Sequence, residues 1–408
     1  MAWPVRLTPP GSLRWVWMYA AVVACSTSGP GDPPQALNDT AIADTHDAST
    51  PDIPEVSTPC PTDASCDVDA TEEVSSAPDW SALRAAIDAS ELEHCSVLIG
   101  TAEGVVFSHD KGDSTPQTVY PIASASKWLS ALTLLRLVDQ GALSLSDTPD
   151  MYLGWWTDDP SDPRSAVTLE QLLSFTSGLA GDSGVAPGVP AVPCIEDGDT
   201  TLEVCAQAIY DNEFAYPPGE TFYYGPTHLH VAGAMALAGS NQRWNQVFRA
   251  QFSELGLAPT TAFAFPSLDN PRLAGGATAS AEDYGKILRA LLGGELLSAS
   301  SLAAMAADHT PSGVTLANMP PVTTTNSAWH YALGCWRECS EAVYGPSCDE
   351  AGTLSSPGAF GFYPWWDQRR GFWGVIATQL PAGAGASTTV PLGQAWAELA
   401  AEQLAPSR

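Results

Sequence analysis

The spacing of apolar residues predicts regular secondary structure from about residue 79 onward. Trp80–Leu92 and Ser124–Gln140 carry apolar side chains at helical spacing, and Gly141 stands where the second helix would end. Between these helices, Ser96–Gly100 and Gly104–Ser108 are rich in β-forming residues and flank a short turn. They are predicted to form a hairpin.

Strand patterns return in the last part of the chain after a long helical stretch. Residues 142 to about 300 are predicted to form mainly helices and loops, followed by strand-like runs at Ala332–Trp336, Ala359–Trp366 and Phe372–Gln379. Leu392–Leu404 is predicted to be a closing helix. Strands at both ends of this body predict an α+β fold: an antiparallel sheet flanked by helices, built from N- and C-terminal segments, with a mainly helical subdomain inserted.

The N-terminus has the pattern of an export signal. Arg6 and Arg14 precede a short apolar stretch, Trp15–Ala24, which is too brief to span a bilayer. Small residues just before Cys25 resemble a bacterial lipobox, so residues 1–25 are predicted to be a lipoprotein signal peptide, with lipidation of Cys25. An ordinary signal peptide cleaved nearby is the alternative. Both predict export, and the first predicts a membrane-anchored lipoprotein of the bacterial cell envelope, on its periplasmic or surface side.

Residues 26–78 are predicted to form an acidic disordered tether in front of a folded domain at residues 79–408. The tether has eleven acidic residues, no Lys or Arg and few large apolar side chains, so it cannot bury enough surface to offset its ordering entropy. The whole chain has 46 acidic and 16 basic residues, a net charge of -30. This charge repels phosphate backbones and excludes nucleic acid as a partner. A membrane contact is expected only through a lipid on Cys25.

The cysteines predict disulfides. Without Cys25, eight of the nine cysteines remain, an even number in an exported chain. Zinc binding is the weaker alternative because no Cys-x-x-Cys pair exists, and no metal or other cofactor is expected. The connectivity is left open. Proximity along the chain favours three pairs and elimination leaves the fourth: Cys60–Cys66, Cys194–Cys205, Cys339–Cys348 and Cys95–Cys335.

Two Ser-x-x-Lys patterns offer a serine with the basic neighbour that a hydroxyl nucleophile needs near neutral pH. Ser108 ends a predicted strand and Lys111 falls in the following turn, where nothing makes the two side chains converge. Ser124 begins the long predicted helix, and Lys127 lies one turn further on the same face. The Ser124 hydroxyl also lies at the positive end of that helix. Ser124 and Lys127 are therefore the candidate pair, and a plain N-cap role for Ser124 is the alternative.

The pair belongs to a series of motifs that occur in order, across roughly residues 80 to 405. They are Ile122–Lys127, Gly141–Asp147, Thr168–Leu179, Pro218–Thr227, Pro271–Gly276 and Gly358–Phe362. Together they closely resemble the serine β-lactamase and penicillin-binding-protein superfamily, specifically its class C-like branch, which includes bacterial carboxylesterases. The resemblance implies a β-lactamase/transpeptidase-like fold and an acyl-enzyme intermediate on the serine.

The resemblance also implies a third residue beside the pair. The family's Tyr-Ser-Asn element supplies a tyrosine that shares proton transfer with the lysine, and Tyr224 occupies that place. Because a cation beside a phenol favours loss of the phenol's proton, Lys127 and Tyr224 are expected to relay protons to and from Ser124. A packing role is the alternative for Tyr224. Gly225 and Pro226 replace the family's Ser and Asn, which removes an amide that would contact substrate.

The family's third element, a cation or imidazole followed by Thr or Ser and then Gly, falls on Ser356–Gly358. Ser356 and Gly358 are thus expected at the substrate-binding edge, without the group that would grip the carboxylate of a β-lactam or a D-alanine. A backbone N–H group can donate a hydrogen bond whatever side chain its residue carries. The N–H groups of Ser124 and Ala359 are therefore expected to form an oxyanion hole.

Histidines and tryptophans give weaker candidates. His228 and His230 are two apart in a predicted helix and so lie on different faces. Each is expected to have a packing or surface role, and lining the cleft is the alternative. The Trp155–Trp156 and Trp365–Trp366 pairs could wall an apolar acyl pocket. A half-buried strand explains the second pair equally well.

These features predict an exported serine hydrolase acting through an acyl-enzyme on Ser124. A small neutral ester is the expected substrate because the carboxylate-binding groups are missing. The first alternative is a D-alanyl-D-alanine carboxypeptidase or β-lactamase, which would need an Arg or Lys from elsewhere in the cleft. The second alternative is a catalytically silent binding protein on the cell surface. The oligomeric state is not predicted.

Overall fold

The computed structural model describes residues 77–181, 191–320, 328–381 and 383–405. The predicted signal peptide and the acidic tether, with Cys25, Cys60 and Cys66, lie outside the described residues. Among the helices that are described, none is long and apolar enough to cross a membrane.

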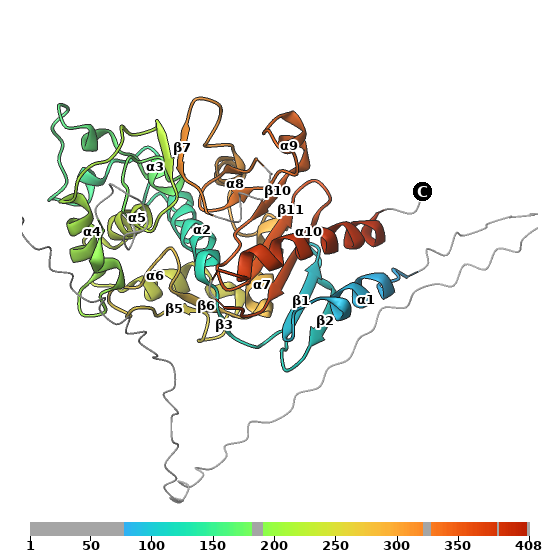
Figure 1. Ribbon diagram of the computed structural model, residues 1–408. Coiled ribbons are helices and arrows are strands. Elements are labelled where there is room, and N and C mark those ends of the chain that lie inside the picture. Colours follow the sequence, from blue (N-terminus) through green and yellow to red (C-terminus); the bar gives the residue numbers. More distant parts are fainter. Residues whose placement is uncertain (1–76, 182–190, 321–327, 382, 406–408) are drawn as a thin grey trace, which may run out of the picture. The chain divides into compact units, whose positions relative to one another are not determined.

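An antiparallel sheet of seven strands carries the fold (Figure 1). Its order is β2-β1-β12-β11-β10-β9-β8, and every neighbouring pair is antiparallel. The N-terminal hairpin pairs with β12, so the predicted sheet built from both ends of the body is confirmed. The strands are β1 (Cys95–Gly100), β2 (Val105–Lys111), β8 (His330–Tyr331), β9 (Trp336–Arg337), β10 (Thr353–Ser355), β11 (Tyr363–Asp367) and β12 (Phe372–Ala377).

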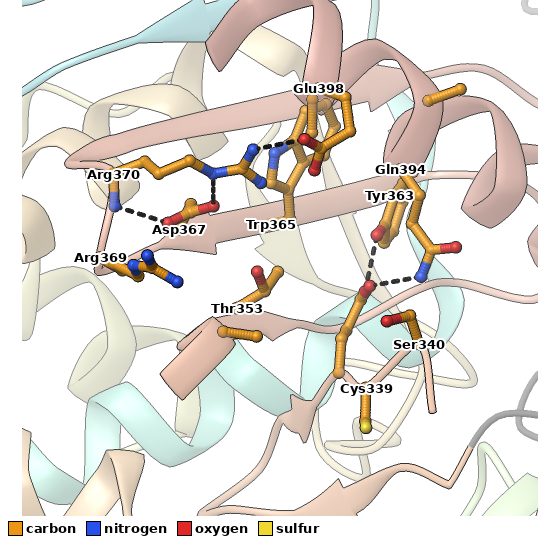
Figure 2. A pocket seen from close by; sticks show the side chains of 14 residues that line it. Cys339, Ser340, Thr353, Tyr363, Trp365, Asp367, Arg369, Arg370, Gln394 and Glu398 are labelled. Carbon is orange, nitrogen blue, oxygen red and sulfur yellow. Dashed lines mark hydrogen bonds and ion pairs between the residues drawn. The ribbon is translucent and has the colours of Figure 1, made fainter. Parts of the chain in front are cut away.

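Helices cover both faces of this sheet. Trp373 and Ile376 are three positions apart on β12 and so point to opposite sides. A Cβ on Gly285 of α7 would meet Trp373, whereas a Cβ on Gly393 of α10 would lie near Ile376. Helix α1 packs beside α10, and a cleft remains between α10 and strands β10 and β11 (Figure 2). These helices are α1 (Ser81–Ala89), α7 (Ala281–Leu292) and α10 (Gly385–Leu404).

Apart from α9, which lies between β9 and β10, the remaining elements form the predicted helical part from β3 to β7. Helix α2 (Ser126–Asp139) contacts α5, α6 and α8. Every residue from Ser126 to Leu135 is buried, as expected for a helix surrounded by protein. The other elements are α3 (Leu169–Leu173), α4 (Leu202–Tyr210), α5 (Thr227–Leu237), α6 (Trp244–Gln251), α8 (Ala299–Ala306), α9 (Pro346–Ala351), β3 (Tyr120–Pro121), β4 (Thr221–Tyr223), β5 (Ala262–Phe263), β6 (Ala277–Ala279) and β7 (Thr315–Asn318).

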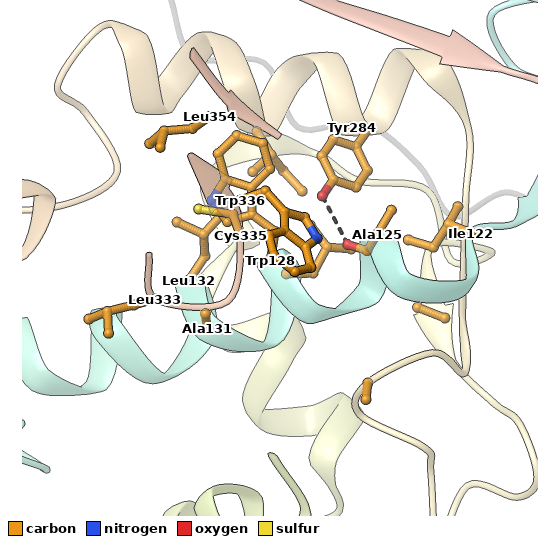
Figure 3. Packing of buried hydrophobic residues seen from close by; sticks show 14 of the residues in the cluster. Ile122, Ala125, Trp128, Ala131, Leu132, Tyr284, Leu333, Cys335, Trp336 and Leu354 are labelled. Atoms are coloured by element: carbon orange, nitrogen blue, oxygen red, sulfur yellow. Dashed lines mark hydrogen bonds between the residues drawn. The ribbon is translucent and has the colours of Figure 1, made fainter. Parts of the chain in front are cut away.

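The predicted strand at Ala332–Trp336 is mostly the tight turn that joins β8 to β9. The N–H of Ala332 donates to the carbonyl oxygen of Cys335 at 2.9 Å, and Gly334 has φ 75°. This turn packs on α2 (Figure 3), where a Cβ on Gly334 would lie 2.3 Å from the Cβ of Ala131. The apolar run is therefore buried against a helix and not by strand alternation.

Three other boundaries differ from the prediction. Strand β2 continues through Lys111, which was expected in the turn after Ser108. Residues 359–362 form a turn before β11 and not its first half, since Gly361 has φ 101° and its N–H donates to the carbonyl oxygen of Gly358 at 2.9 Å. Helix α10 begins at Gly385, ahead of the predicted start at Leu392, and it contains Pro391. Packing of α10 on the sheet outweighs the low helix propensity of its first residues.

The cysteines form two of the predicted disulfides, Cys194–Cys205 and Cys339–Cys348. The Cys95–Cys335 pairing is wrong, because both residues are buried free thiols. Cys95 begins β1 and Cys335 adjoins β9, four strand spacings away in the sheet. That is about 19 Å, far beyond the reach of a disulfide. Burial raises the pKa of the Cys95 thiol to about 11 and that of Cys335 further still, so both behave as inert core residues.

Candidate active site

The candidate nucleophile lies in a single 3₁₀ turn in front of α2. The turn covers Ala123–Ala125, so Ser124 precedes the helix. Ala123 has φ 44°, in the left-handed region that is costly for a residue with a side chain. From α7, the Tyr284 hydroxyl donates to the carbonyl oxygen of Ala125 at 3.0 Å (Figure 3). The residues on both sides of the serine are thus held, Ala123 in a rare conformation and Ala125 by a tertiary hydrogen bond.

Lys127 points its amino group at the Ser124 hydroxyl. Its Nζ donates to Ser124 Oγ at 3.0 Å and to the carbonyl oxygen of Ala274 at 2.8 Å. The Lys127 side chain is only 5% exposed, while Ser124 is half-buried. Neither the 3₁₀ turn nor α2 has a side-chain cap, so the N-cap alternative for Ser124 is not observed. An amine at this distance can take up the proton of the hydroxyl.

The segment around Ala274 supports this pair, and the sequence assigned it no role. Two hydroxyls of α2 anchor it: Ser126 Oγ accepts from the N–H of Ala277 at 3.1 Å, and Ser130 Oγ donates to the carbonyl oxygen of Leu273 at 2.8 Å. The motif Pro271–Gly276 was the available signal. Its chemistry resides in a main-chain carbonyl, which no side chain in the sequence reveals.

Tyr224 lies immediately after β4 and beside Lys127. The Lys127 Nζ lies 4.4 Å from the centre of the Tyr224 ring, and this ring stacks on Trp336 with centroids 5.3 Å apart. Asn318 of β7 fixes the tyrosine backbone, accepting from the N–H of Tyr224 at 3.1 Å and donating from Nδ2 to its carbonyl oxygen at 2.6 Å. Asn318 is a supporting residue that the sequence did not single out.

The end of β10 closes on the nucleophile turn. The Ser356 hydroxyl donates to the carbonyl oxygen of Ser124 at 3.0 Å, and Ser356 is 3% exposed. Gly358 runs so close to the turn that a Cβ would lie 2.3 Å from the carbonyl oxygen of Ile122. Ser356, predicted to touch substrate, therefore has its hydroxyl bound to the protein itself, and Gly358 is required for close backbone approach.

Ala359 follows in the exposed turn after β10. Within the described structure, the N–H of Ala359 donates to no protein acceptor, and the same holds for the N–H of Ser124. Two unused backbone donors on the segments that meet at Ser356 are what an oxyanion hole requires.

The second Ser-x-x-Lys pattern has a structural role. Lys111 Nζ donates to the carbonyl oxygens of Asp88 at 2.9 Å and Ser90 at 2.7 Å, at the end of α1. Ser108 lies opposite Leu98 within the β1–β2 hairpin. A cation bound to the last carbonyls of a helix stabilises that helix end.

The two histidines are structural as well. His228 is fully buried: its Nε2–H donates to the carbonyl oxygen of Tyr223 at 2.8 Å and its Nδ1 accepts from the Ser177 hydroxyl at 2.8 Å. Burial, together with the nearby charge of Lys127, lowers the pKa of His228 to about 4. Burial also lowers the pKa of His230 to about 4. Both are fully buried and stay neutral at physiological pH.

The tryptophan pairs are part of the packing. Trp155 and Trp156 surround Tyr210 of α4, with centroids 5.7 and 4.8 Å from its ring. Trp365 and Trp366 are successive residues of β11, each at most 3% exposed. The half-buried-strand explanation of the second pair is therefore replaced by a strand buried on both faces.

Comparisons with known proteins agree with this arrangement. Protein flp of Staphylococcus aureus (strain MW2) is 26% identical over 136 residues, which are 33% of this chain and 26% of that protein. The chain thus matches only about a quarter of that relative's length. Penicillin-binding protein 4 of Amycolatopsis lactamdurans is 30% identical over 158 residues, 38% of this chain and 39% of that protein.

Two solved structures share the fold. A proposed β-lactamase from Bacteroides dorei DSM 17855 has a TM-score of 0.64 at 23% identity, covering 79% of this chain and 99% of that one. EstCE1, described as a hydrolase with promiscuous acyltransferase activity, has a TM-score of 0.61 at 20% identity, covering 79% and 96%. The family model described as Beta-lactamase matches residues 93–391. With that match, the antiparallel sheet and the order of its motifs, the chain belongs to the β-lactamase family of serine hydrolases.

Proposed function

We propose that the protein is an exported esterase that acylates Ser124 and then releases the acyl group to water. The observation that carries this proposal is the contact of 3.0 Å between Lys127 Nζ and Ser124 Oγ, with the Tyr224 ring beside the same nitrogen. A pair held this way has a nucleophile and a base in hydrogen-bond reach.

The proposed reaction has two balanced halves. Ser124 Oγ attacks the ester carbonyl carbon while its proton passes to the neutral amine of Lys127, and the N–H groups of Ser124 and Ala359 bind the resulting oxyanion. The bond from carbon to the leaving oxygen then breaks, and the alcohol leaves with that proton, relayed through Tyr224. A water molecule repeats the attack on the acyl-enzyme, which yields the carboxylic acid and free Ser124.

The preference for esters rests on two residues of the site, Pro226 and Ser356. Pro226 offers no amide to a peptide-like substrate, and the Ser356 hydroxyl is bound to Ser124. A neutral ester loses nothing by these changes, whereas a substrate carboxylate loses its partner. EstCE1, described as a hydrolase with promiscuous acyltransferase activity, supports acyl transfer on this fold. The relative named penicillin-binding protein 4 supports the alternative, a D-alanyl carboxypeptidase or β-lactamase.

Labelling separates these functions from a silent binding protein. The purified protein is treated with a fluorescent fluorophosphonate, and a second sample with a fluorescent penicillin. The esterase proposal expects strong fluorophosphonate labelling that Ser124→Ala removes, with weak penicillin labelling. Strong penicillin labelling would replace the esterase by the peptidase or β-lactamase, and no labelling at all would leave the binding protein.

Export and anchoring belong to the same proposal and rest on residues 1–25. Cells expressing the full chain are grown with an alkyne-tagged fatty acid. We expect label on the wild-type chain and none on Cys25→Ala. An unlabelled wild-type chain in the culture fluid or periplasm would favour the ordinary signal peptide.

A further inference from the structure

A second cavity lies away from Ser124, between α10 and strands β10 and β11 (Figure 2). This space, here called the α10 cleft, has a volume of about 650 Å³, within the usual range for small-molecule sites. None of Ser124, Lys127 or Tyr224 lines it. It opens on the face of the sheet that carries α10, so it is separate from the candidate active site.

Each carboxylate that lines the α10 cleft already accepts a hydrogen bond from the protein. Tyr363 donates to Glu338 Oε1 at 2.6 Å and Gln394 donates to its Oε2 at 2.8 Å. Arg370 donates to Asp367 at 2.6 Å and to Glu398 at 2.8 Å. Three carboxylates and two guanidinium groups line the α10 cleft, so its formal charge is -1 in a chain with net charge -30. Burial raises the pKa of Glu338.

One cationic side chain at the α10 cleft has no protein acceptor in the described part of the chain. Arg369 lines the cleft from the turn between β11 and β12 (Figure 2) and makes no hydrogen bond or ion pair with any described residue. Each of the other described arginines has such a contact, as Arg337 has with Asp349. An unpaired guanidinium group favours a ligand that brings acceptor oxygens.

Apolar groups also line the α10 cleft. They include Ala395 and Ala397 of α10 and the rings of Tyr363 and Trp365. Small side chains on the helix leave room for the body of a ligand, and aromatic rings bury apolar area with specific geometry. The guanidinium group of Arg369 matches a carboxylate in two parallel hydrogen bonds.

We propose that the α10 cleft binds a small organic carboxylate, with its apolar body between α10 and β11 and its carboxylate on Arg369. The site is independent of Ser124 and takes the class of compound that ester hydrolysis releases. This inference stands whether or not the protein is an esterase, because it uses no residue of the candidate active site.

Calorimetric titration of the full chain carrying Ser124→Ala tests the proposal, since that variant cannot turn over an ester. Sodium benzoate is the probe, and benzamide is the uncharged probe of the same shape. We expect benzoate to bind one site and benzamide to bind about tenfold more weakly or worse, as expected for loss of a charge-assisted pair. Adding Arg369→Gln should lower the affinity for benzoate to the affinity for benzamide.

Two further variants make the result specific. Ala395→Trp, at an exposed position of α10, should fill the α10 cleft and abolish binding of both probes. Arg289→Gln, which removes an arginine paired with Glu295 on another surface, should change nothing. Neither Arg369→Gln nor Ala395→Trp should alter ester hydrolysis by the chain with Ser124 intact. Benzoate that fails to bind, or that binds Arg369→Gln as tightly as its parent, would overturn the proposal.

Discussion

Ser356 donates a hydrogen bond from its side-chain hydroxyl to the main-chain carbonyl oxygen of Ser124, 3.0 Å away and 232 residues earlier in the chain. The end of β10 is thereby bound to the strained turn in which Ala123 has φ 44°. The position that would contact a substrate carboxylate in the wider family instead holds the nucleophile in place.

Replacing Ser356 by Ala should lower kcat for p-nitrophenyl acetate about fivefold with little change in KM, because one neutral hydrogen bond of about 1 kcal/mol is lost. Steady-state kinetics measure this effect. Ser165→Ala is the matched control, since the Ser165 hydroxyl also donates to a main-chain carbonyl at 2.8 Å, far from the site. Equal kinetics for Ser356→Ala and wild type would mean that this bond does not position Ser124.

Ser124→Ala should abolish hydrolysis of short-chain p-nitrophenyl esters while thermal unfolding stays unchanged, because the nucleophile is lost and little volume changes. Ser108→Ala should be silent, since Lys111 is bound to the end of α1. Activity of Ser124→Ala within tenfold of wild type would refute the assignment of the nucleophile.

Lys127→Met and Tyr224→Phe should each lower kcat/KM by about 100-fold or more if both residues transfer protons. The double variant should lose little more than either single variant, because residues of one catalytic unit are not additive. The four rate constants of this cycle are compared at one pH. Losses that multiply would show that Tyr224 acts apart from Lys127, as a packing residue on Trp336.

Neutral short-chain esters should be hydrolysed with a higher kcat/KM than nitrocefin or benzylpenicillin. Loss of a charge-assisted contact worth about 1.5 to 3 kcal/mol should slow acylation by a carboxylate-bearing substrate by roughly 10- to 150-fold. Initial rates with both classes on one enzyme preparation decide the order. Nitrocefin turned over faster than the esters would mean that another residue binds the carboxylate, and the β-lactamase function would then replace the esterase.

Stability should fall as the pH is lowered from about 6.5 to about 4, because His228 and His230 are neutral in the fold down to a pKa of about 4 while the unfolded chain protonates near 6.5. The unfolded state then binds more protons, so acid favours it. Each histidine contributes about 3 kcal/mol over this interval. Glu338, whose pKa is raised by burial, acts in the opposite direction.

Urea unfolding at pH 7 and pH 4.5 measures this loss. The variant His230→Gln should shrink the acid-induced loss by about half, and the difference from wild type removes the contribution of Glu338, which both proteins share. His94→Gln, at an exposed position, is the control and should keep the full loss. An unchanged pH dependence in His230→Gln would contradict the role of its burial.

Much of the site could be predicted because its first members are local. Ser124 and Lys127 are one helical turn apart, so helix geometry alone brings their side chains together. The hairpin of β1 and β2 was predictable for the same reason, since a short turn joins two β-rich runs. Tyr224 was placed only by its resemblance to a family motif, because nothing in the intervening sequence indicates that β4 ends beside α2.

The sequence by itself determined the local pairings, the helical and β-rich segments, and the two disulfides that close short loops. Only the tertiary structure decided that Ala274 offers its carbonyl oxygen to Lys127, that Ser356 binds Ser124, and that Cys95 and Cys335 stay apart. The physical reason is that side-chain chemistry and helical or strand periodicity are written residue by residue. Contacts made by main-chain atoms across hundreds of residues depend instead on how the packed helices and the sheet place those atoms in space.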